Sequence, residues 1–180
     1  MANGTLKVSN IETSSGSGTI TLGQSGETVT IASGVTQTVA VNTPAFEAYV
    51  NSTLALSNDT ITKVTFDTEN FDTDGDYDNS TNYRFTPTVA GKYFVYSFFR
   101  WNSSTDVDSV RLYVYKNGSS ILKTTNRQSY YDVQVGYCVV DMNGSTDYIE
   151  IFAYQNSGGS FNISTGAEHS RFGAYKIIGA

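Results

Sequence analysis

Apolar and polar residues alternate in short segments along the chain after residue 44, and turn-forming residues separate these segments. A period of two places successive side chains on opposite faces of a β-strand. The pattern predicts strands at Ala45–Val50, Thr62–Phe66, Tyr83–Thr86, Lys92–Asn102, Ser109–Lys116, Tyr131–Asp141, Asp147–Gln155 and Arg171–Ile178. Asn-Gly pairs at Asn117 and Asn143 are strong hairpin signals. Residues 45–56 also fit a short amphipathic helix, but their Val, Asn, Ser and Thr content favours an extended segment. The chain is therefore predicted to be all-β, a sandwich or jelly roll.

The strand at Lys92–Asn102 is apolar on both faces. One face carries Tyr93, Val95 and Phe99, and the other carries Phe94, Tyr96 and Phe98. The strands at 109–116 and 147–155 also place tyrosines opposite an aliphatic face. An antiparallel sandwich needs only one buried face per strand, so the second face implies another protein surface, most simply a second copy of the chain. The alternative is that these tyrosines are merely exposed.

The first quarter of the chain has a different residue pattern. Between Gly16 and Thr43 there is no aromatic residue, and short alternating triplets such as Ile20–Leu22 and Val29–Ile31 are separated by Ser-Gly pairs. Strands this short are stable when neighbouring segments or other chains cover them. We therefore expect an attachment arm over residues 1–18, an intertwined β-repeat stem over 19–43 and a head over 44–180. The alternative for the stem is a flexible Gly/Ser linker.

Charge and composition limit the classes of partner that we expect for this protein. The 180-residue chain has a net charge of −6 and a single cysteine, Cys138. A basic stripe for phosphate binding is lacking, so we expect no nucleic-acid partner. No stretch approaches the ~20 apolar residues of a membrane span, so we expect no membrane insertion. The N-terminus has no apolar signal-peptide core, which favours synthesis in a cytoplasm without conventional export.

An acidic segment is the strongest candidate for metal chemistry. Asp72, Asp74 and Asp76 alternate in a stretch without Lys or Arg, a spacing that can turn carboxylates toward one hard cation such as calcium. The segment is not an EF-hand loop, because Gly75 comes too early and Tyr83 stands where the closing Glu would be. The alternative is a solvated acidic loop, in which case the protein needs no cofactor.

Catalytic signals are weak, and we expect no enzyme. The only histidine, His169, has no Gly-x-Ser-x-Gly elbow to serve. Cys138 lies within a predicted strand and is expected to be a small buried side chain. The candidate ligand contacts are loop residues, because exposed aromatic and arginine side chains are common binding hot spots. They are Trp101, Arg127, Tyr130 and Tyr131.

Several spaced elements resemble one known family. Phe71, Tyr77-Asp78, Phe85-Thr86-Pro87 and Ala90–Tyr96 are similar to the signature of the C1q-like domain, and Phe172, Gly173 and Tyr175 resemble its closing strand. Val95 departs from the family's usual Phe. The resemblance covers about residues 44–180 and implies a ten-stranded C1q/TNF-like jelly roll that assembles as a homotrimer. It implies structural or trimer-core roles for Phe85, Pro87, Gly91, Tyr93, Phe94, Tyr96, Phe172, Gly173 and Tyr175.

The N-terminal segment is similar to the opening of many tailed-phage virion proteins, in which a small β stem precedes a trimeric head. This resemblance implies a virion surface spike or fibre, made in the host cytoplasm. Residues 1–18 would attach to other virion proteins, and the head would bind a host receptor or cell-surface glycan, or decorate the particle. The alternative is a non-viral C1q-like lectin or adhesin.

Overall fold

The computed structural model describes residues 26, 28, 42–102, 107–128 and 132–178. The chain divides into two units, residues 1–39 and 40–180. The expected arm, and the expected stem apart from Gly26, Thr28, Asn42 and Thr43, lie outside the described residues. All strands below belong to the second unit, the head.

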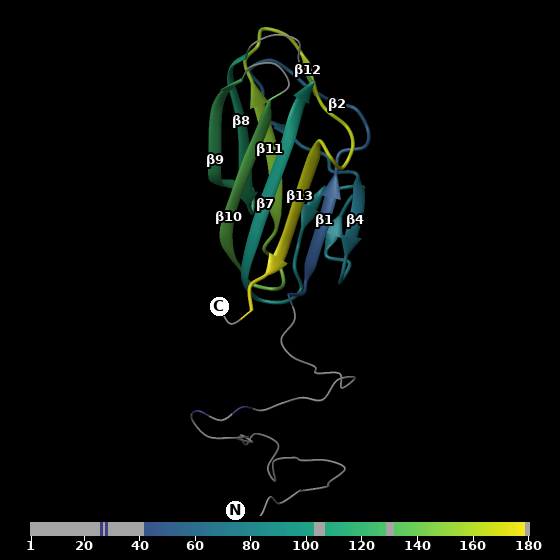
Figure 1. Cartoon of the computed structure of the whole chain (residues 1–180), viewed down its shortest axis with the longest axis vertical. Coiled ribbons are helices and arrows are strands. Elements are labelled where there is room, and N and C mark those ends of the chain that lie inside the picture. Colours follow the sequence, from purple (N-terminus) through teal and green to yellow (C-terminus); the bar gives the residue numbers. More distant parts are fainter. Residues whose placement is uncertain (1–25, 27, 29–41, 103–106, 129–131, 179–180) are drawn as a thin grey trace, which may run out of the picture. The chain divides into compact units, whose positions relative to one another are not determined.

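The head is built from two antiparallel sheets (Figure 1). The front sheet has the strand order β2-β12-β7-β13-β1-β4, with β10 also paired to β7. The back sheet has the order β5-β6-β11-β8-β9, with β3 also paired to β11. The bounds are β1 Ala45–Tyr49, β2 Leu54–Leu56, β3 Thr62–Lys63, β4 Thr68–Asp72, β5 Tyr77–Asp78, β6 Arg84–Phe85, β7 Gly91–Asn102, β8 Val107–Lys116, β9 Ser119–Gln128, β10 Val133–Met142, β11 Ile149–Gln155, β12 Phe161–Ile163 and β13 Ser170–Lys176.

The core lies between the two sheets and follows the alternation of the sequence. In β7, the inward residues Tyr93, Val95 and Phe99 are fully buried. In β8 and β11, Val110, Leu112, Val114, Ile149, Ile151 and Ala153 are buried in the same way. Burying one such large apolar side chain contributes about 1.5–3 kcal/mol. The alternation of the sequence therefore separates the buried face of each strand from its outer face.

Aromatic rings close one region of this core. The Phe46 ring stacks on Tyr77 and Phe85 with centroids 4.5 Å apart in each pair, and meets Phe172 edge-on at 4.8 Å. These residues come from β1, β5, β6 and β13, so the cluster joins both sheets. Edge and offset contacts of this kind add about 0.5–1.5 kcal/mol per pair beyond burial.

All eight predicted strands are present, but the description of ten strands was too low for the described residues, where thirteen segments are found. The segments missed were β2, β4, β5, β9 and β12. They are short or polar: β9 is an edge strand whose sequence carries Lys, Thr, Asn and Arg. The predicted hairpin at Asn117-Gly118 joins β8 to β9, and both residues have the positive φ that a tight hairpin turn requires. Among the described residues, no helix is long and apolar enough to cross a membrane.

Candidate binding surfaces

The outer face of the front sheet carries an apolar patch. We define the front-face patch as Phe94, Phe98, Val133, Val135, Tyr137, Val139 and Tyr175. Its most exposed members lie on β10, where Tyr137 is 65% and Val139 56% exposed. The sequence prediction of a second apolar face on β7 is confirmed, since Phe94 and Phe98 point away from the core.

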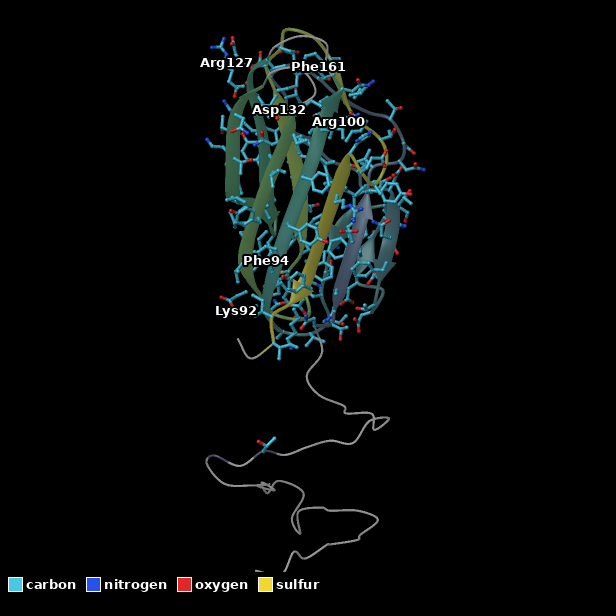
Figure 2. All side chains as sticks on the ribbon, in the orientation of Figure 1. Lys92, Phe94, Arg100, Arg127, Asp132 and Phe161 are labelled. Carbon is cyan, nitrogen blue, oxygen red and sulfur yellow. The ribbon has the colours of Figure 1, made fainter. Side chains whose placement is uncertain are left out.

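The strand register gathers the patch around Phe94 (Figure 2). Phe94 pairs directly with Val139 of β10 and with Tyr175 of β13. Its ring centroid lies 6.2 Å from that of Tyr137 and 5.5 Å from that of Tyr175. Residues opposite one another in an antiparallel pair share a face, so the patch is continuous across three strands.

A polar cluster borders the patch on β1. Tyr96 lies between Tyr137 and Gly173 in the register, and its hydroxyl donates a 2.6 Å hydrogen bond to Glu47. Arg171 and Asn70 also donate to Glu47, which is buried. Burial and the bond to Glu47 raise the pKa of Tyr96 above its ordinary value. The cluster holds the Tyr96 ring flat over β13, where a Cβ at Gly173 would overlap it.

The outer face of the back sheet is also aromatic, but cationic side chains of the same chain cover it. The Arg111 guanidinium lies 4.2 Å from the centre of the Tyr154 ring, and Arg84 lies 4.5 Å from that of Tyr148. The Lys63 ammonium approaches the Phe152 ring and pairs with Glu150. Cations of the same chain therefore cover these back-face rings through cation–π contacts.

The expected calcium ligands do not converge. Asp72 accepts hydrogen bonds from the backbone N–H groups of Asp74, Gly75 and Tyr77, while Asp76 accepts from the N–H and hydroxyl of Thr88. Among the described residues, which include Asp72, Asp74 and Asp76, there is no group of three acidic, His or Cys side chains that could hold a metal ion. In this structure the carboxylates of Asp72 and Asp76 accept hydrogen bonds within the local turns, and calcium binding stays a prediction.

The structure places the expected ligand-contact residues in different environments. Trp101 lies in β7 rather than in a loop and is only 1% exposed, where its ring meets Phe99 edge-on. Its role as a surface contact was therefore wrong, because the inward alternation of β7 continues to this position. Arg127 is exposed at the end of β9 and pairs with Asp108 at 2.9 Å. Tyr130 and Tyr131 lie outside the described residues.

The residues that carried the family resemblance fall into two groups. Phe85, Pro87, Tyr93 and Phe172 are buried. Phe94, Tyr96 and Tyr175 instead lie on the outer face of the front sheet. Gly91 begins β7 with a φ of 148°, and a Cβ there would come within 2.7 Å of Lys176 Cε. The positive φ favours glycine, whereas the flexible end of the Lys176 side chain could move aside for a Cβ.

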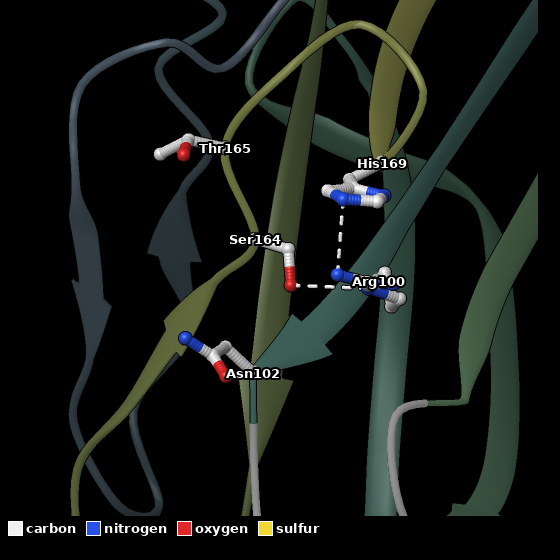
Figure 3. Close-up of a pocket in the computed structure, with 5 residues that line it drawn as sticks. All are labelled: Arg100, Asn102, Ser164, Thr165 and His169. Carbon is white, nitrogen blue, oxygen red and sulfur yellow. Dashed lines mark hydrogen bonds between the residues drawn. The ribbon is translucent and has the colours of Figure 1, made fainter.

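A polar pocket lies where β7, β12 and β13 meet at one end of the head (Figure 3). It has a volume of about 430 Å³ and is lined by Arg100, Asn102, Ser164, Thr165 and His169. Arg100 and Asn102 end β7, Ser164 and Thr165 follow β12, and His169 precedes β13. Sequence reasoning had noted only His169 here, as a loop or interface residue. The available signal was Arg100, a charge at an outward position of an aromatic strand.

Hydrogen bonds hold the Arg100 side chain in place. Its Nε donates to Ser164 Oγ at 3.3 Å, and its Nη2 lies 3.0 Å from His169 Nε2. A guanidinium can only donate, so in this hydrogen bond His169 Nε2 is the acceptor. Glu168 Oε1 lies 3.4 Å from the same Nε2.

Comparison with solved structures identifies the fold. The chain is similar to the globular domain of the zebrafish complement 1qA protein, with 20% identity, a TM-score of 0.52 and coverage of 75% of this chain and 98% of that one. It is similar to murine APRIL, with 13% identity, a TM-score of 0.57 and coverage of 74% and 98%. It is also similar to the PRD1 vertex protein P5, with 13% identity, a TM-score of 0.58 and coverage of 77% and 99%. The head therefore has the C1q/TNF-like jelly-roll fold.

No protein-family model matches the sequence, and comparison with curated proteins also found no match. Identities of this size establish a shared fold and leave function to be argued from the surfaces described above.

Proposed function

We propose that this chain is a trimeric surface protein of a phage virion, with the C1q/TNF-like head as its outward binding or decorating part. The observation that carries the proposal is the front-face patch. Tyr137, Val139 and Val135 are half-exposed or more, and they are continuous with Phe94 and Tyr175. A patch of contiguous apolar side chains on one sheet face is typical of a protein–protein interface.

Three copies of the same chain are the simplest occupant of this patch. The polar cluster of Glu47, Tyr96 and Arg171 lies beside it, as a polar rim lies beside the apolar centre of an interface. The like-folded domains of the C1q/TNF class typically form trimers, which supports a closed three-fold arrangement over an open chain of copies.

The virion assignment rests on a separate support. The PRD1 vertex protein has the same fold and is covered over 99% of its chain. Residues 1–18 and 19–43 would then attach the head to other virion proteins and thread the three chains together. The head would bind a host receptor or glycan at three sites, or cover the particle. The alternative, a non-viral lectin or adhesin of C1q type, is supported by the likeness to the zebrafish complement domain.

Labelling of particles tests the virion role. Antibodies raised against the full chain should label the surface of particles purified from the source of the sequence, and the soluble protein should compete with those particles for adsorption to host cells. Labelling without competition would leave decoration as the role. Absence of the chain from purified particles would overturn the virion assignment in favour of the lectin or adhesin.

A further inference from the structure

The pocket at Arg100 has the chemistry of a sugar site. Its described lining consists of a guanidinium, an imidazole, a carboxamide and two hydroxyl groups, without any aliphatic residue, Phe, Tyr or Trp. Hydroxyl and carboxamide groups both donate and accept hydrogen bonds, as the hydroxyls of a sugar require. The volume of about 430 Å³ lies within the range of small-molecule sites and accommodates a monosaccharide or a short glycan end.

Arg100 adds a preference for negative charge. A guanidinium presents N–H groups in a planar fork that matches carboxylate and phosphate oxygens. The bonds to Ser164 and His169 already fix this side chain, so a ligand would not bear the full cost of ordering it. Among the five lining residues, Arg100 is the side chain that carries a permanent positive charge, and this charge gives the pocket its preference for an anion.

The pocket also lies at a favourable end of the head. Ala45, where the chain enters β1, is level with Tyr175 of β13 and Phe94 of β7. Arg100 is six positions further along β7, about 20 Å away at the rise of an extended strand. Figure 2 shows Phe94 and Arg100 toward opposite ends of the sheet. The pocket is thus at the end of the head remote from the chain's entry.

We propose that the pocket of Arg100, Asn102, Ser164, Thr165 and His169 binds an anionic sugar, with Arg100 holding a carboxylate or phosphate and the hydroxyl and amide groups holding the ring. The proposal rests on the proposed function, because it names the ligand class of the host-binding head. Arg100 pairs in the register with Val133, so the pocket lies beside the front-face patch. A trimer built on that patch carries three such pockets, one from each copy. Three weak sites acting together give strong attachment to a glycan-covered surface.

A glycan array tests the site directly. The full-length protein would be applied to an array of sugars ending in carboxylates or phosphates, each beside its neutral counterpart. We expect the anionic sugars to bind. Whether the carboxylate sugars or the phosphate sugars bind more strongly then shows which anionic group the pocket prefers. Arg100→Gln should weaken binding of these sugars at least about tenfold, the loss of one charge-assisted contact. Binding of neutral sugars alone, or of no anionic sugar, would overturn the proposal.

Variants at exposed positions guard against a folding artefact. Thr165 is exposed, so Thr165→Trp should fill the pocket without disturbing the core and should abolish binding. Glu168→Gln removes an exposed like charge beside the pocket, so it should strengthen binding of anionic sugars about two-fold and leave neutral sugars unchanged. Lys123→Gln removes a positive charge from exposed β9 and serves as the matched control, with no expected change. Unaltered binding in both Arg100→Gln and Thr165→Trp would place the sugar elsewhere.

The same proteins separate this inference from the proposed function. If the chain binds anionic sugars through Arg100 but is absent from particles, the sugar site stands and the virion role fails. If the chain labels particles and competes for host cells while Arg100→Gln competes equally well, the virion role stands and the sugar site is wrong.

Discussion

Both outer faces of the head carry aromatic side chains, but the two sets of rings differ in how they are covered. Both carry tyrosine and phenylalanine at outward positions. On the back sheet, Arg111 and Arg84 stack on Tyr154 and Tyr148, so the rings are covered from within the chain. On the front sheet, the Phe94 ring contacts the rings of Tyr96, Tyr137 and Tyr175, and Tyr137 remains 65% exposed.

The comparison teaches that aromatic content alone does not mark an interface. What distinguishes the front face is the chemistry of the flanking strands. β10 supplies Val133, Val135, Tyr137 and Val139 at its outward positions, whereas the corresponding back-sheet strands supply Arg and Lys. A long cationic side chain can lie across a ring and shield it, but valine cannot. The front face therefore leaves apolar side chains exposed, whereas cations of the same chain cover the back-face rings.

The largest expected effect is on assembly. Tyr137→Glu places a charge at the most exposed point of the front-face patch, where burial against another copy would be costly. We expect the trimer's dissociation constant to rise at least about 100-fold while the monomer stays folded. Light scattering across a concentration series and circular dichroism would measure the two effects. Ile61→Glu, at an exposed apolar position before β3, is the control and should leave the trimer intact.

A smaller effect is expected at Gly173. A Cβ there would overlap the Tyr96 ring, so Gly173→Ala should displace the ring and break its bond to Glu47. Overpacking of this kind costs about 1–3 kcal/mol in the free energy of unfolding. Urea denaturation would measure it. Gly159→Ala, where a Cβ meets nothing within 4 Å, should change stability by less than about 0.5 kcal/mol. Equal effects at the two glycines would contradict the close approach of Tyr96 to β13.

Alkaline pH should destabilise the head through its buried phenols, Tyr93 and Tyr96 of β7 and Tyr77 of β5, whose pKa values burial raises. Burial raises the pKa of Tyr93 to about 12 and, with the bond to Glu47, raises that of Tyr96. A phenol whose pKa is raised on folding stabilises the fold below its ordinary pKa of 10 and loses that contribution as the pH rises through the folded value. Denaturation series from pH 9 upward should therefore show stability falling above about pH 10.

Two variants show which tyrosine causes the loss of stability at alkaline pH. Tyr96→Phe should reduce the alkaline loss of stability. Tyr154→Phe should change it little, because the pKa of this back-face phenol is raised first by a hydrogen bond to exposed Asp59 rather than by burial. A larger change in the Tyr154 variant would contradict the contrast between the two faces.

The smallest expected effect is at the covering cation of the back face. Arg111→Ala exposes the Tyr154 ring and should cost about 0.5–1 kcal/mol of stability, the usual size of an exposed cation–π contact. The oligomeric mass should not change. Arg111→Lys keeps the charge but loses the flat stacking surface, so it should recover part of the loss. A change of assembly in Arg111→Ala would show that the back face also contributes to the interface.

The alternation in the sequence predicted much of this fold, and its failures have physical causes. The inward faces of β7, β8 and β11 follow directly from the period of two. The edge strand β9 was missed because a polar edge strand lacks a hydrophobic signature. Trp101 was counted among loop residues although the predicted strand runs to Asn102 and Trp101 falls on its inward face, where its ring meets Phe99.

The candidate surfaces were harder to predict, because they depend on contacts across the fold. The acidic spacing at Asp72, Asp74 and Asp76 resembles a cation site, yet local backbone N–H groups satisfy the carboxylates. The pocket joins Arg100 to Ser164 and His169, which are 64 and 69 positions away, so no local motif could indicate it. The shielding of the back face was invisible for the same reason.

The central claim is that the front-face patch is an interface between copies of this chain. Light scattering of the full-length protein on a sizing column tests it most directly. We predict a mass three times the 19.6 kDa of the chain, independent of dilution over the accessible range. A stable mass of 19.6 kDa would contradict the claim, and the exposed rings of Tyr137 and Tyr175 would then require a different protein as their partner.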